Sequence, residues 1–127
     1  MRSLKNLFIL NTIVALSYGT GALFLPAWVM SAYGLTLNPA GALMTRFYAA
    51  ELIAHGWMTW QARNAGASPA RKAILSSRCI GNAIRTLVSI AFMVSGQADV
   101  RGLLIIVLFG SFALAYGYFW LVRPDAD

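Results

Sequence analysis

The fold is decided by the stretch RCIGNAIRTLVSIAFMVS, residues 78–95, which is mostly apolar but carries four spaced polar residues. These are Arg78, Asn82, Arg85 and Ser89, at positions i, i+4, i+7 and i+11, so an α-helix places them along one face. An ionised side chain in the middle of a bilayer costs about 2.5–3.5 kcal/mol, so such a face turns toward other helices. The stretch predicts a membrane-spanning helix with a polar inner face.

The composition points to the same class of protein. The chain has 127 residues, of which 59% are hydrophobic and 11% are charged, whereas a soluble domain has about 25% charged residues. The net charge of +6 comes from basic residues scattered between apolar segments, which argues against nucleic-acid binding. We therefore expect one transmembrane domain, residues 1–127, that crosses a bacterial inner membrane several times.

Four segments are long enough to cross the hydrocarbon core, which takes about 20 helical residues. Helices are favoured over strands, because a spanning helix satisfies its own backbone groups. Short connections make successive helices antiparallel neighbours. The sequence thus predicts an all-α, up-down-up-down four-helix bundle, with helices at about residues 4–25, 40–62, 72–95 and 101–122.

The basic residues predict the orientation of this bundle. Cytoplasmic loops of membrane proteins are enriched in Lys and Arg. One predicted side holds only Arg101, beside Asp99, and the other side holds all the remaining loop cations. Both termini are therefore expected in the cytoplasm, with Arg2, Lys5, Arg63, Arg71, Lys72 and Arg123.

A second polar stripe runs along the helix predicted at residues 40–62. It contains Tyr48, Glu51, His55 and Thr59, at i, i+3, i+7 and i+11. We compare the depth of each residue in the membrane by counting residues from the helix ends. By this count the pairs at equal depth are Glu51 with Arg85, His55 with Asn82, and Thr59 with Arg78. The two stripes are therefore expected to interlock in a polar layer.

Two interpretations of this layer stay open. A Glu51–Arg85 ion pair would fix the register of two neighbouring helices. Alternatively, Arg85 would hold an anionic or carbonyl group while Glu51 or His55 handles a proton, and the excess of arginine over carboxylate supports this interpretation. The candidate site, structural or ligand-binding, consists of Glu51, Arg85, His55, Asn82, Arg78 and Tyr48.

Other chemistry has little support in the sequence. Cys79 is the only cysteine and His55 the only histidine, so the chain offers no zinc, iron–sulfur or bis-histidine haem ligand set. A single-histidine pigment or haem ligand remains open for His55. No nucleophile–base pair and no glycine-rich phosphate loop stands out. We expect no bound cofactor or metal, and a non-catalytic role is favoured over an enzyme.

Three segments carry a resemblance to a known family: FLPAWVMSAYGL (24–35), TRFYAAELIAHGWMTWQAR (45–63) and NAIRTLVSIAFMVSGQ (82–97). They resemble small bacterial four-helix membrane proteins of the DoxX-like kind. Arg46, the Trp60–Arg63 segment, Arg85 and Gly96 stand where that family shows its recurrent residues. The resemblance implies the four-helix fold and implies little about activity.

These observations lead to two hypotheses of function. The first is a non-catalytic accessory or assembly subunit of a larger inner-membrane complex. It would contact lipids and a protein partner or a second copy, partly through the small residues Gly110, Ala113 and Gly117. The alternative is a carrier or enzyme that binds a small molecule or lipid between the second and third predicted helices. That alternative predicts a cavity beside Arg85.

Overall fold

The computed structural model describes residues 2–125, and every regular element in this range is helical. The predicted all-α class is confirmed, and the described residues contain no strand. The helices are α1 (Arg2–Phe24), α2 (Pro26–Ser31), α3 (Pro39–Ala62), α4 (Pro69–Val94) and α5 (Leu103–Gly117). A 3-10 turn, η1 (Val100–Gly102), precedes α5, and a π-helical turn, η2 (Tyr118–Val122), follows it.

Helix α4 begins three residues before the predicted start at residue 72. Ser68 is its N-cap, and the Ser68 hydroxyl accepts a hydrogen bond from the Arg71 backbone N–H at 3.2 Å. Pro69 occupies the first helical position, where its missing N–H and fixed φ are compatible with a helix. The charged pair Arg71 and Lys72 therefore belongs to the first turn of α4 and not to a loop.

The segment after α1 was predicted as a loop that begins at Pro26, and this prediction was wrong in part. Pro26 ends α1 but also begins α2, because proline is well tolerated at the first position of a helix. Helix α2 ends in a turn in which the Tyr33 N–H donates to the Met30 carbonyl at 3.0 Å. Gly34 follows with a φ of 76°, a left-handed conformation that glycine adopts without strain.

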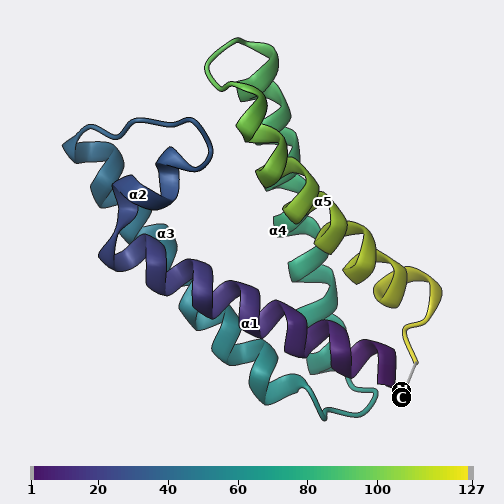
Figure 1. Ribbon diagram of the computed structural model, residues 1–127. Helices are drawn as coiled ribbons and strands as arrows, with labels where there is room; N and C mark the ends of the chain where they lie inside the picture. The colour runs from purple at the N-terminus through teal and green to yellow at the C-terminus, as the bar shows by residue number, and fades with distance from the viewer. Residues whose placement is uncertain (1, 126–127) are drawn as a thin grey trace.

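The long helices form two antiparallel hairpins. Helix α1 packs along α3, and α4 packs along α5 (Figure 1). The hairpins meet where α1 begins and η2 ends, which we call the terminal end, and they diverge toward the opposite loop end (Figure 1). Helices α3 and α4 were predicted as closely packed neighbours along their length, but their main packing partners are α1 and α5 respectively.

Two glycines allow α1 and α3 to approach closely. A Cβ atom added at Gly19 would lie 3.1 Å from the Ala49 carbonyl oxygen and 3.2 Å from the Leu52 Cβ. A Cβ atom added at Gly56 would lie 2.9 Å from the Leu16 Cγ. Each helix thus contributes one glycine to the shared contact, which fixes the two helices at short distance.

The small residues of α5 pack within the chain. A Cβ added at Gly117 would lie 3.2 Å from the Cys79 Sγ, and one added at Gly110 would lie 3.6 Å from the Thr86 Cγ2. Both neighbours belong to α4. These two glycines therefore serve the α4–α5 contact.

One apolar cluster joins both hairpins at the terminal end. Its buried members come from α1, α3, α4, α5 and η2, and they are Leu4, Phe8, Ala62, Leu75, Phe112, Tyr116 and Phe119. Two helical segments of the described chain are long and apolar enough to cross a membrane, Ser3–Phe24 and Val100–Val122. Helices α3 and α4 have similar length but contain the charged residues of the two polar stripes.

Candidate functional site

A buried polar network lies just inside the terminal end, between α1, α3 and α4. Asn11 and Thr12 of α1 both contact Thr59 of α3: the Asn11 amide donates to the Thr59 hydroxyl at 3.3 Å, and the two hydroxyls lie 2.9 Å apart. All three side chains are buried. Thr59 was predicted to meet Arg78, but it faces α1 instead. The network is therefore built on α1, a helix outside the predicted polar layer.

Arg78 reaches this network from α4. Its side chain is only 4% exposed, and its Nη2 donates to the Asn11 Oδ1 at 3.0 Å. The guanidinium also lies 5.9 Å from the ring centre of Tyr116, a cation–π distance. An arginine stays protonated in proteins, so the terminal end buries a full positive charge. Its contacts are a neutral amide and an aromatic ring.

Arg85 lies two turns farther along α4, toward the loop end. Its Nη1 donates to the Asn82 Oδ1 at 3.3 Å. Its guanidinium lies between two rings, 5.3 Å from the centre of Tyr48 on α3 and 5.6 Å from that of Phe109 on α5. Arg85 therefore bridges the two hairpins through aromatic contacts, and no carboxylate of residues 2–125 binds it.

Arg85 opens onto a cavity of about 390 Å³ between the hairpins. The lining comes from all five α-helices, so the cavity exists only because the hairpins diverge. Its polar side chains are Tyr18, Thr45, Tyr48, Arg85 and Ser89. Its apolar side chains are Met30, Met44, Ile84, Val88, Ile105 and Phe109. We call this cavity the groove.

The groove continues toward the loop end. A smaller cavity of about 110 Å³ shares Val88, Ser89 and Ile105 with it and adds loop residues that include Tyr33 and Ala98. Together the two cavities form an elongated space with a cationic group near its inner end. Most of its wall is apolar, as in sites for amphiphilic ligands.

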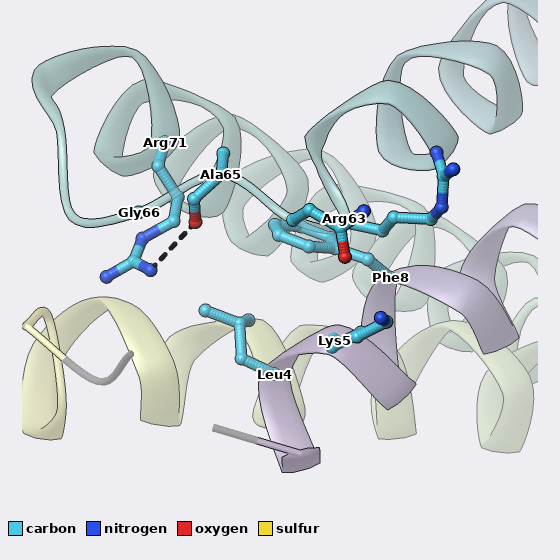
Figure 2. A pocket seen from close by; sticks show the side chains of 8 residues that line it. Leu4, Lys5, Phe8, Arg63, Ala65, Gly66 and Arg71 are labelled. Atoms are coloured by element: carbon cyan, nitrogen blue, oxygen red, sulfur yellow. Dashed lines mark hydrogen bonds between the residues drawn. The ribbon is translucent and has the colours of Figure 1, made fainter.

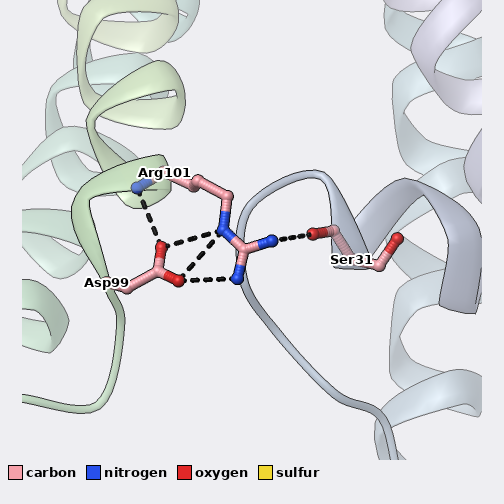
Figure 3. Close-up of polar contacts among 3 residues, drawn as sticks. All are labelled: Ser31, Asp99 and Arg101. Carbon is pink, nitrogen blue, oxygen red and sulfur yellow. Dashed lines mark hydrogen bonds and ion pairs between the residues drawn. The ribbon is translucent and has the colours of Figure 1, made fainter.

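Contacts near the loop end connect the two hairpins. Arg101 donates two hydrogen bonds to Asp99 from Nε and one from Nη2, the last at 2.7 Å, and its Nη1 donates to the Ser31 carbonyl at 3.3 Å (Figure 3). Gly34 lies against the Asp99 carboxylate. The Arg101 hydrogen bonds hold the pKa of Asp99 below its usual range. The Arg101–Ser31 hydrogen bond and the Gly34–Asp99 contact join the hairpins, and we call these two contacts, together with the Arg101–Asp99 pair, the latch.

The expected Glu51–Arg85 ion pair does not form. Glu51 is exposed on the outer surface of α3, and the only ion pair among the side chains that the structure describes is Arg101–Asp99. The reason is the drift of the stripe around α3: at 100° per residue, Thr59 lies about 80° from Glu51. With Thr59 turned toward α1, Glu51 lies at the outer edge of the stripe.

The remaining predicted residues gather between the hairpins without satisfying one another. The expected His55–Asn82 hydrogen bond is not formed. His55 is half-buried and its Nδ1 is buried without a partner. Four further side-chain atoms are buried without a hydrogen-bond partner, namely the Asn82 Nδ2, the Tyr48 hydroxyl, the Arg78 Nε and the Tyr116 hydroxyl. Buried polar atoms of folded proteins nearly always have a partner, so this cluster has unused capacity for binding a polar group.

Sequence reasoning missed two members of the cluster. Asn11 of α1 was given no role in the sequence-based prediction, although it is the acceptor for Arg78. Tyr116 lies in a helix that reads as almost entirely apolar, and its ring and hydroxyl face Arg78. A lone asparagine and a lone tyrosine in apolar spans are the signals that could have found them, since buried polar side chains seek partners.

The arrangement can hold an anion but offers little for other chemistry. No group of three or more His, Cys, Asp or Glu side chains in the described part of the chain could hold a metal ion. Arg78 and Arg85 lie on one face of α4 without an acidic partner in the described part of the chain. Guanidinium groups bind carboxylates and phosphates through paired N–H donors, so an anionic headgroup is the ligand that these residues suit.

The comparisons with known proteins give a family without a described activity. No curated protein and no solved structure matches the chain. A family model with the description "Domain of unknown function (DUF8292)" matches residues 1–120. Because this match covers nearly the whole sequence, the chain belongs to the DUF8292 family.

Proposed function

We propose that this protein binds an amphiphilic small molecule or lipid with an anionic headgroup inside a bacterial inner membrane. The headgroup would contact Arg85 in the groove, and the apolar part would lie along the groove wall. All four long helices would span the bilayer, with both termini in the cytoplasm. This is a binding or carrier role, and it assigns no catalytic step.

Charge and packing support the membrane arrangement. The described cations at the terminal end include Lys5, Arg63, Lys72 and Arg123, whereas Arg101 at the loop end is paired with Asp99. This asymmetry favours a cytoplasmic terminal end. Large apolar side chains are exposed along the outer surfaces of the helices, as expected for contact with lipid.

The observation that carries the proposal is the uncompensated charge beside the groove. Arg78 is buried and Arg85 is half-buried, and neither has a carboxylate partner among the residues that the structure describes. Removing one partner of a buried ion pair costs about 3–5 kcal/mol, because a charge is left without compensation. An anionic headgroup at Arg85 would relieve this cost. The unpartnered Tyr48 hydroxyl and Asn82 amide could hydrogen-bond to the same headgroup.

The chemistry of the wall sets the kind of ligand. Ile84 and Val88 of α4 and Ile105 and Phe109 of α5 offer an apolar surface next to Arg85, on the hairpin that diverges from α1 and α3 toward the loop end. A fully polar anion would leave this surface in contact with water. A molecule with one anionic end and an alkyl or prenyl chain would cover it, with the chain passing between the hairpins into the surrounding lipid.

Native mass spectrometry with two matched probes tests the proposal. Oleate and oleyl alcohol have the same chain but differ in headgroup charge. We expect oleate to bind more tightly, and Arg85→Gln to weaken oleate binding about 10- to 150-fold, because a hydrogen bond to a charged group is worth about 1.5–3 kcal/mol. Arg123→Gln removes an exposed arginine outside the groove and serves as the control.

The two probes also separate specific from general binding. Arg85→Gln should leave the affinity for oleyl alcohol unchanged. Equal affinity for the two probes, or oleate binding that is the same in Arg85→Gln and wild type, would show that the groove does not recognise an anionic headgroup.

A second function is supported by the position of Glu51. Its carboxylate is exposed near the middle of α3, between Ala50 and Leu52 and one turn from Phe47. An ionised carboxylate facing lipid at that depth is costly. A partner helix with a basic side chain would cover it, and Ala50 and Ala54 would allow close approach. The protein would then be a non-catalytic accessory subunit of a larger membrane complex.

Site-specific crosslinking tests this second function. A photoreactive amino acid at Ala54, next to Glu51 on α3, should give one discrete crosslinked protein in cells, and Glu51→Gln should reduce its yield. The same amino acid at Leu114, an exposed position on α5, is the control. A strictly monomeric protein with no Glu51-dependent crosslink would count against an accessory role.

A further inference from the structure

A second cavity lies at the terminal end, away from the groove. It has a volume of about 410 Å³ and lies between the start of α1 and the segment that joins α3 to α4 (Figure 2). Its lining includes three cationic side chains, Lys5, Arg63 and Arg71, and two apolar ones, Leu4 and Phe8. We call it the basic pocket. It shares no residue with the groove.

The three cations flank the basic pocket from two sides. In Figure 2, Arg71 lies on one side and Lys5 on the other; Arg63 begins near Lys5, and its guanidinium is turned outward, where it donates to the Trp60 carbonyl. None of them forms an ion pair within the described part of the chain. The pocket is lined by no acidic residue, so its charge of three is not balanced by the pocket itself.

Arg71 is the fixed element of the pocket. Its side chain is 2% exposed, and its guanidinium donates to the Ala65 carbonyl at 3.1 Å and to the Pro124 carbonyl at 3.2 Å. These bonds tie the α3–α4 connection to the end of the chain and hold a positive charge in place. Both acceptors are neutral, so they leave this charge uncompensated.

Aromatic residues place the pocket at the level of a membrane surface. Arg63 stacks on Trp60, with 3.7 Å between the guanidinium carbon and the ring centre, and Trp57 is exposed one turn away on α3. Tryptophans gather where lipid headgroups meet the hydrocarbon. Leu4 and Phe8 give the pocket an apolar floor next to its cationic rim.

We propose that the basic pocket binds the phosphate group of an anionic phospholipid from the cytoplasmic leaflet. Lys5 and Arg63 would contact the phosphate on one side and the fixed charge of Arg71 would lie on the other, while the acyl chains follow the apolar surface of α1. Pockets of basic residues at the cytoplasmic side of helices suit such headgroups. The proposal depends on the membrane orientation given above, but it is independent of the groove and its ligand.

The test measures lipid binding to the purified full-length protein by native mass spectrometry. Phosphatidylglycerol is the anionic probe, and phosphatidylcholine with the same acyl chains is the zwitterionic probe. The double variant Lys5→Gln with Arg63→Gln should weaken phosphatidylglycerol binding about 25-fold, at about five-fold for each cation that contacts the headgroup. The control double variant, Lys72→Gln with Arg123→Gln, loses the same net charge outside the pocket and should change binding less than three-fold.

Further arms identify the source of the phosphate and guard against misfolding. Lys5 is exposed, so Lys5→Gln alone should fold and should show the five-fold effect if the double variant does not fold. Inorganic phosphate should not displace phosphatidylglycerol, and displacement would point to a soluble phosphate compound and overturn the lipid proposal. Equal effects of the two double variants, or equal binding of the two lipids, would also overturn it. The loss caused by Lys5→Gln with Arg63→Gln should persist in an Arg85→Gln background, in which the groove has lost its contact to an anionic headgroup, and this separates the basic pocket from the groove.

Discussion

The hydrogen bond between Arg78 and Asn11 gives a quantitative prediction. Asn11→Leu keeps the side-chain size but removes the acceptor of the buried guanidinium, whose Nε already lacks a partner. Thr59 keeps its contacts to Thr12 and to the His55 carbonyl, so it is not left without partners. The loss therefore falls mainly on Arg78. A hydrogen bond to a charged group is worth about 1.5–3 kcal/mol, and we expect Asn11→Leu to lower the free energy of unfolding by about 2–3 kcal/mol.

A double-mutant cycle isolates this interaction. Arg78→Met removes the charge together with its desolvation cost, so Asn11→Leu should be much less damaging in the Arg78→Met background. Denaturant unfolding in detergent micelles would measure all four proteins. We expect a coupling free energy of about 1.5–3 kcal/mol. Additivity within about 0.5 kcal/mol would refute the reasoning, because it would mean that the two side chains do not interact.

Three further predictions concern packing, pH and the exposed carboxylate. Gly19→Ala forces a methyl group against the α3 backbone and should destabilise the protein by about 1–3 kcal/mol. Gly81→Ala is the control, because its added methyl group meets only a 3.9 Å contact in α4, and it should be neutral or stabilising by up to about 1 kcal/mol. Unfolding curves that rank the two variants oppositely would contradict the close α1–α3 contact. The pKa of Asp99 is lower in the folded protein than its ordinary value of about 3.9. The Asp99 carboxylate therefore stays ionised and the latch stays formed above about pH 3.9, and the latch is lost as the pH falls through the lower folded-state pKa. Spin labels on the two loops at the loop end should thus show one distance from pH 7 to about pH 5 and a longer distance only in stronger acid. Asp99→Asn should lengthen the distance between the labels at pH 7. A longer distance in the wild-type protein near pH 6 would contradict this prediction. Glu51→Gln removes no hydrogen bond or ion pair of the described structure, so the unfolding free energy should change by less than about 0.5 kcal/mol, and a larger loss would mean that Glu51 has an internal partner.

The helical class followed from the sequence because each long segment has its own local signals. The α4 stripe is narrow: Arg78, Asn82, Arg85 and Ser89 lie within about 60° at 100° per residue. All four therefore turn inward together, as buried or half-buried side chains. The start of α4 was misplaced because the cap at Ser68 and Pro69 was not read as a helix start, although both residues favour one.

The pairing of the helices could not be read from the same patterns. Glu51 was predicted opposite Arg85 because the two residues lie at a similar distance from the ends of their helices. That distance does not determine how each helix is rotated about its own axis. The rotation of α3 is set by Gly19 and Gly56, whose close contact turns Thr59 toward α1 and leaves Glu51 exposed. The cavity beside Arg85 that the ligand-binding hypothesis requires is present, and it arises from the divergence of the hairpins, which no single helix encodes.

The most direct test of the central claim is an experimental structure of the protein extracted with its native lipids. We expect non-protein density in the groove, with a polar group within about 3.2 Å of a guanidinium nitrogen of Arg85 and an elongated tail along Val88 and Ile105. A groove filled only by protein side chains, with Arg85 bound to a carboxylate of the protein, would contradict it.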